Sequence, residues 1–226
     1  MPANSPRWPF LSVISVLACL AMAGCDDDGG KLKNSSPGPN DSNVVAAFGD
    51  SITMGNMCPA PPYPARLPPM IGKSVVNAGI NGTTARANVG RCQAVIGQVR
   101  PAYMLILYGI NDLIHSQGVP GTLAALDEMI SICIENDVAP AIATYPVPVK
   151  SYRAFAFNII ALNQGIRNLA GARGIPCVDL EREFALPGYP DANGDVLSDE
   201  SLFTGEGLHP NDVGTRIMAY SFADLF

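Results

Sequence analysis

The chain has 226 residues, a formal net charge of −6 and a hydrophobic content of 48%. This composition supplies enough apolar side chains for a folded core and excludes a largely disordered chain. The acidic balance, without any cluster of Lys and Arg, argues against a nucleic-acid-binding protein. The length is suited to one or two domains.

The apolar run 10–23 follows a single basic residue, Arg7. It is shorter than the roughly 20 residues that a membrane-spanning helix needs, and its basic start and small final residues are typical of a secretory signal. The segment Ala23-Gly24-Cys25 resembles a bacterial lipobox, in which the cysteine becomes the lipid-modified first residue of the mature protein. We therefore expect residues 1–24 to be a lipoprotein signal peptide, Cys25 to be the lipidation site, and the protein to be exported and anchored in the bacterial cell envelope. An ordinary signal peptide with an incidental cysteine is the alternative.

Residues 25–43 begin with three aspartates and continue with Gly, Ser, Pro and Asn. They offer almost nothing to bury, which predicts a flexible tether. We therefore expect one folded domain over residues 44–226, held near a membrane by the tether and acting as a monomer.

Four cysteines follow the leader: Cys58, Cys92, Cys133 and Cys177. An exported protein can form disulfides, whereas the lack of a CxxC pair gives no support for a zinc or redox site. Cys133 and Cys177 fall in apolar segments, where a buried thiol is the simplest interpretation. Cys58 and Cys92 lie near expected loops or helix starts, so we favour a Cys58–Cys92 bridge, although the sequence does not settle the pairing.

From residue 44 onward, short apolar runs alternate with segments of helical periodicity. Continuous apolar runs predict strands buried on both faces, as in a parallel sheet. The alternation predicts an α/β domain, a three-layer α/β/α sandwich of the flavodoxin-like kind with about five parallel strands. The expected strands are 44–48, 75–80, 103–108, 140–145 and 176–180, and the expected helices are 83–99, 120–136, 151–172 and 210–226.

Small and polar residues follow the first three expected strands, at 49–51, 78–82 and 109–112. In such sheets the ligand crevice lies at the carboxyl ends of the strands, so these residues should meet there. The chain has two histidines, and one of them, His209, comes three residues after Glu206. A carboxylate at that spacing can fix the tautomer of a catalytic base.

Ser51 is the candidate nucleophile, because a serine at a strand-to-helix turn presents its hydroxyl to the crevice, and His209 is the candidate base. An oxyanion needs hydrogen-bond donors, and the candidates are the N–H groups of Ser51 and Gly79 and the side-chain amide of Asn111. Gly79 also lets the backbone approach a substrate closely. The other histidine, His115, we interpret as a polar loop residue rather than a substrate contact.

Asp50 and Asp112 also lie at these strand ends. An Asp beside a turn usually accepts hydrogen bonds from nearby backbone N–H groups. We therefore interpret both as turn-stabilising residues rather than catalytic ones.

Four segments resemble the conserved blocks of the SGNH or GDSL hydrolases, in the order in which that family has them. The resemblance begins near residue 44 and runs to the end of the chain. Its context, with each block at the edge of an expected strand or helix, makes the four together far more specific than a single Gly-Asp-Ser. The blocks are FGDSITMG (48–55), NAGINGTTA (77–85), YGINDL (108–113) and EGLHPND (206–212).

The resemblance implies a serine esterase or acylhydrolase that needs no metal or organic cofactor. Ser51 would attack an ester carbonyl, His209 would act as the base, and Gly79 and Asn111 would join the Ser51 N–H in binding the oxyanion. Glu206 departs from the family, which usually has Asp at this position. Its side chain must fold back to reach the His209 ring; otherwise the enzyme would run as a Ser–His dyad.

The substrate is left open by the sequence. A minimal domain favours small-molecule or glycan esters with short acyl or acetyl groups, while thioesters and lysophospholipids stay possible. The alternative is a catalytically weak or inactive envelope lipoprotein that binds a glycan or partner in the same crevice. A flavodoxin-type nucleotide binder is disfavoured, because GDSIT (49–53) has too little glycine for a phosphate cradle.

Overall fold

The computed structural model describes residues 30–189 and 196–226. Five parallel strands form one sheet in the order β2-β1-β3-β4-β5, the flavodoxin-like order, so the expected fold is confirmed. Arg7, the apolar run 10–23 and Cys25 lie outside the described residues. The strands are β1 (Asp41–Gly49), β2 (Ser74–Gly79), β3 (Pro101–Leu107), β4 (Ala139–Ala143) and β5 (Cys177–Val178).

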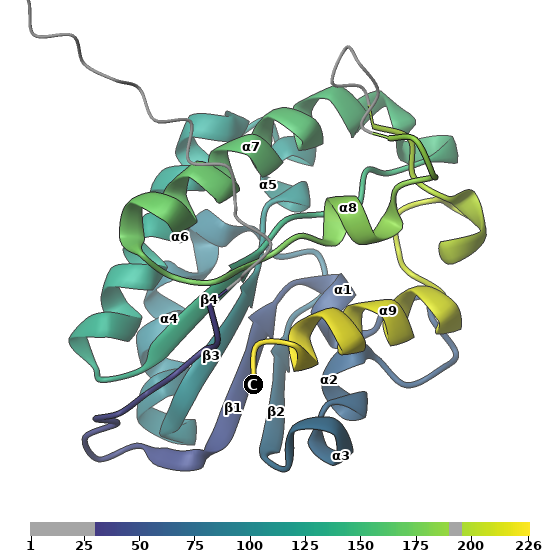
Figure 1. Ribbon diagram of the computed structural model, residues 1–226. Helices are drawn as coiled ribbons and strands as arrows, with labels where there is room; N and C mark the ends of the chain where they lie inside the picture. Colours follow the sequence, from purple (N-terminus) through teal and green to yellow (C-terminus); the bar gives the residue numbers. More distant parts are fainter. Residues whose placement is uncertain (1–29, 190–195) are drawn as a thin grey trace, which may run out of the picture.

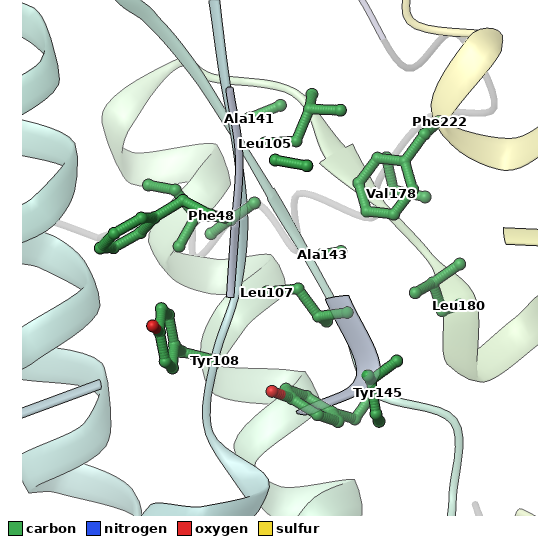
Figure 2. Close-up of a cluster of buried hydrophobic side chains, with 14 of the residues drawn as sticks. Phe48, Leu105, Leu107, Tyr108, Ala141, Ala143, Tyr145, Val178, Leu180 and Phe222 are labelled. Atoms are coloured by element: carbon green, nitrogen blue, oxygen red, sulfur yellow. The ribbon is translucent and has the colours of Figure 1, made fainter. Parts of the chain in front are cut away.

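The centre of the sheet is covered on both faces. Every residue of β3 is buried, and Phe48 of β1 pairs with Ala78 of β2 and Ile106 of β3. This double coverage explains why these strands are continuously apolar rather than alternating. Figure 2 shows Phe48 and Phe222 at opposite sides of the strands, each packed within one continuous core.

Helices cover the sheet on both sides (Figure 1). The four long helices expected from the sequence are present, although the third begins with a 3₁₀ turn. The short helices around the site were not expected. On one face lie α4 (Ala85–Val99), α6 (Gly118–Glu135) and α7 (Ala156–Arg173); on the other lie α2 (Tyr63–Arg66), α8 (Leu180–Phe184) and α9 (Asp212–Ala223); the remaining elements are α1 (Ser51–Met54), α3 (Pro68–Ile71), α5 (Ile110–Ile114), η1 (Lys150–Phe155) and η2 (Glu200–Leu202).

The expected tether differs from the structure over residues 31–43. Leu32 is buried and its N–H donates to the Leu225 carbonyl at 2.7 Å. The Asn34 side chain donates to the carbonyls of Ala102 and Asp137, and β1 already begins at residue 41. These partners are far away in the sequence, so the polar composition of the segment gave no indication that it packs on the domain.

The favoured Cys58–Cys92 bridge is not formed. Cys92 lies inside the core between α4 and α6, with its Sγ 3.9 Å from that of Cys133 and 3.6 Å from the sulfur of Met104. Cys58, by contrast, lies in the segment between α1 and α2. The pairing was wrong because α4 turns Cys92 toward the sheet, and burial of Cys133 in its helix agrees with the expectation.

Across residues 30–189 and 196–226, no helix has the length and apolar character needed to cross a membrane.

Candidate active site

Ser51 stands at the carboxyl end of β1, as the first residue of α1. The preceding residue, Asp50, caps this short helix, because its Oδ1 accepts the Ile52 N–H at 2.9 Å. At the other end of the turn, the Gly55 N–H donates to the Ser51 carbonyl. Ser51 is buried, so its hydroxyl is held by a tight turn rather than by a mobile loop.

His209 reaches the same edge of the sheet from the loop before α9. The Thr204 N–H donates to the His209 carbonyl, and the Val149 N–H donates to that of Gly207, both at 2.8 Å. Asn211 then caps α9 with its side chain. These contacts on both sides fix the backbone of the loop that carries the imidazole ring.

Ser51, His209 and Glu206 form one hydrogen-bonded chain. Ser51 Oγ lies 2.9 Å from His209 Nε2, and His209 Nδ1 lies 2.5 Å from Glu206 Oε1. The longer Glu206 side chain does fold back, and its carboxylate also accepts the backbone N–H groups of Leu208 and His209. Partial burial alone would raise the pKa of Glu206, but these hydrogen bonds outweigh it and lower the pKa below its usual value. An ionised Glu206 can hold a proton on Nδ1 and leave Nε2 free to accept the serine proton.

Asn111 brings its amide to the site from the start of α5. Its Nδ2 donates to the Thr83 carbonyl at 3.0 Å and lies 3.4 Å from Asp50 Oδ2. Both neighbours are acceptors, so the nitrogen rather than the oxygen of the amide faces this part of the site. A substrate oxygen would meet a donor here.

Gly79 is not placed as expected, and Gly82 takes its position at the site. The Gly79 N–H donates to the Asn77 side chain at 2.9 Å, and Gly79 packs directly against the backbone of Met54. Gly82 lines the cavity with Ser51, and its N–H makes no hydrogen bond to any residue that the structure describes. The sequence NAGING (77–82) contains both glycines, and nothing local in it distinguishes the packed one from the one at the site.

A cavity of about 270 Å³ opens over this group. Two larger cavities, of about 340 and 400 Å³, lie along α7 and touch neither Ser51 nor His209. The reactive groups, and not the volume, therefore locate the site. The sequence analysis gave no role to several wall residues. Asn81 and Leu208 lie inside the quoted blocks but carry none of the reactive groups, and the others lie outside the blocks: Asn56, Met57, Ile114 and Tyr152.

His115 and Asp112 do not act in the site, as the sequence predicted. His115 is exposed at the end of α5 and does not line the cavity. Asp112 is buried and accepts the N–H groups of Ala85 and Arg86 at the start of α4.

A serine, a histidine and a carboxylate in one hydrogen-bonded chain beside N–H donors define a hydrolase that acts on acyl groups. Residues 47–217 match the model of the GDSL-like lipase/acylhydrolase family. The chain therefore belongs to this family of ester hydrolases.

Individual relatives are distant. The chain is 24% identical over 175 residues to an Escherichia coli protein named thioesterase 1/protease 1/lysophospholipase L1, covering 75% of this chain and 76% of that protein. A lipolytic protein of the G-D-S-L family from Desulfitobacterium hafniense has a similar fold, with a TM-score of 0.68 at 23% identity, over 82% of this chain and 100% of the other. A catalytic mutant of an acetylxylan esterase from Geobacillus stearothermophilus gives a TM-score of 0.66 at 18% identity, over 82% of this chain and 94% of the other.

Proposed function

We propose that the enzyme hydrolyses short-chain acyl esters through an acyl-serine intermediate. His209 removes the proton from Ser51 as the hydroxyl attacks the ester carbonyl, and Glu206 stabilises the imidazolium that forms. The imidazolium then protonates the leaving alcohol. In the second half, His209 activates water, which releases the acid and restores Ser51.

The oxyanion of each tetrahedral intermediate would be bound by three donors. The Ser51 N–H and the Asn111 amide are two of those expected from the sequence, and Gly82 replaces Gly79 as the third. Donors fixed in place before reaction stabilise the charge without reorganisation.

The observation that carries this proposal is the unbroken Ser51–His209–Glu206 chain at the floor of a small cavity. The volume of about 270 Å³ supports a small acyl group more than a long one, because pockets that hold drug-sized ligands measure about 300–1,000 Å³.

The test is hydrolysis of p-nitrophenyl esters from acetyl to palmitoyl by the wild type and by Ser51→Ala. We expect turnover that is greatest with short acyl groups and is lost in Ser51→Ala. Ser221→Ala is the matched control, because the Ser221 hydroxyl donates to the Ile217 carbonyl within α9, away from the site. Equal rates in wild type and Ser51→Ala would overturn the proposed nucleophile. Turnover greatest with palmitoyl would overturn the short-chain preference alone.

We also propose that the enzyme is exported and lipid-anchored through Cys25, supported by the apolar run 10–23 and the Ala23-Gly24-Cys25 segment. The test is metabolic labelling with an alkyne fatty acid in a bacterial host. Label should appear in the wild type and in Cys19→Ala and be absent from Cys25→Ala. Label retained in Cys25→Ala would overturn this assignment.

A further inference from the structure

The carboxylate of Asp50 is fully buried directly behind the nucleophile, and the proposed mechanism does not use it. Its Oδ1 caps α1, and its Oδ2 accepts a hydrogen bond from the Tyr145 hydroxyl at 2.8 Å. Burial raises the pKa of Asp50 to about 7, opposed by the hydrogen bonds from Ile52 and Tyr145, with Asp112 nearby adding to the rise. A buried carboxylate of this kind attracts any donor within reach.

The donor within reach is the amide of Asn111. Its Nδ2 carries two hydrogens, of which one is held by the Thr83 carbonyl at 3.0 Å. The other is donated to Asp50 Oδ2 in a long hydrogen bond of 3.4 Å, and a small rotation of the whole amide would redirect it to a substrate oxygen. A carboxylate oxygen is a stronger acceptor than an ester carbonyl, so Asp50 and the substrate compete for the same hydrogen. The distances show that Tyr145, and not Asn111, is the principal donor to this oxygen.

Tyr145 is itself held firmly. It lies just beyond the end of β4, past Ala143, with its ring within the core (Figure 2). Its N–H donates to Asn163 Oδ1 and its carbonyl accepts from Asn163 Nδ2, both at 2.8 Å. This double contact with α7 fixes where the phenol hydroxyl points.

We propose that Tyr145 is a positioning residue for catalysis: by donating to Asp50 Oδ2 at the shorter distance, it keeps the hydrogen bond from Asn111 to this oxygen long and weak, and so leaves the amide free to move to the oxyanion. This inference depends on the proposed esterase function, since it assigns Tyr145 a role in transition-state stabilisation. It predicts a defect in turnover rather than in substrate binding.

The first experiment compares Tyr145→Phe with the wild type on p-nitrophenyl acetate. We expect kcat to fall by about tenfold, a partial loss of one oxyanion donor, with KM nearly unchanged. The matched control is Tyr63→Phe, which also removes a buried phenol hydroxyl, one whose partner is Thr53 at 3.2 Å. The control should keep the wild-type kcat even if its stability falls.

The second experiment repeats the substitution in an Asp50→Asn background. Without the carboxylate, no charged acceptor competes with the substrate for the Asn111 amide. Adding Tyr145→Phe should therefore change kcat by less than about twofold. A merely structural role would give the same loss in both backgrounds. Titration of Ser51 with a phosphonate ester counts the folded sites in each variant, which separates slow turnover from misfolding. If Asp50→Asn does not fold, the inference is tested by the kcat and KM of Tyr145→Phe compared with those of the wild type and of Tyr63→Phe.

Unchanged kcat in Tyr145→Phe, or a rise in KM alone, would overturn the inference. The proposed function would survive that result as long as Ser51→Ala remains inactive. Activity retained by Ser51→Ala would instead overturn the proposed function itself.

Discussion

The Glu206 carboxylate makes three hydrogen bonds within one short turn, two with His209, at Nδ1 of the ring and at the backbone N–H, and one with the backbone N–H of Leu208. The carboxylate therefore orients both the ring and the loop that carries it. An Asp at this position would be one methylene shorter and could not span the same set of contacts without a shift of the loop.

Glu206→Gln should lower kcat by about 10² to 10⁴, because the Gln amide can donate to Nδ1 and favour the tautomer that cannot accept the serine proton. The measurement is kcat on p-nitrophenyl acetate, with Glu200→Gln as the control for loss of an exposed acid. Wild-type kcat in Glu206→Gln would show that the enzyme works as a Ser–His dyad.

The two glycines of residues 77–82 should respond differently to alanine. A Cβ on Gly79 would lie 2.8 Å from the Met54 Cα, and such overpacking costs roughly 1–3 kcal/mol. Gly82 has open space around it but a φ of +70°, so Gly82→Ala should cost about 1–2 kcal/mol from the backbone conformation alone, less than the clash at Gly79. Urea unfolding of both variants checks the order, and a larger loss in Gly82→Ala would contradict the packing described for Gly79.

Asp50 should make stability depend on pH. Its pKa is about 7 in the folded state against 3.8 for the free side chain, so the folded protein binds the extra proton between these values. The free energy of unfolding therefore falls as pH rises from about 4 to about 7, by up to the order of 4 kcal/mol from this group. Asp50→Asn cannot titrate, so its stability relative to the wild type should increase across this range. The measurement is the free energy of unfolding in urea at each pH. If it changes with pH in the same way for both proteins, the raised pKa of Asp50 is refuted.

Residues 31–40 should contribute to stability. Leu32 is 6% exposed, and truncation of a buried leucine costs about 2–5 kcal/mol, with the low end expected at the margin of a core. Leu32→Ala should therefore lower the urea midpoint clearly, whereas Leu186→Ala, at a residue 38% exposed, should have little effect. Similar midpoints for Leu32→Ala and the wild type would mean that the segment acts as the tether expected from the sequence.

Local patterns were sufficient for the parts of the fold that depend on local properties. Continuous apolar runs predicted all five strands, and strand ends predicted where Ser51 and Asn111 meet. Tyr145 is the last residue of the expected fourth strand (140–145), whereas β4 ends at Ala143, so the sequence analysis did not count Tyr145 among the residues that follow a strand. The packing of Leu32 and Asn34 could not be predicted, because their partners lie roughly 70 to 190 residues away and are brought near only by the finished sheet.

Ser51 and His209 are 158 positions apart in the chain, and this separation also sets when the enzyme can first work. During synthesis Ser51 is made just after the first strand, whereas His209 is made only after all five strands. No partial chain that stops short of the His209 loop contains the reactive pair. The appearance of esterase activity during refolding therefore reports when the His209 loop has docked beside Ser51.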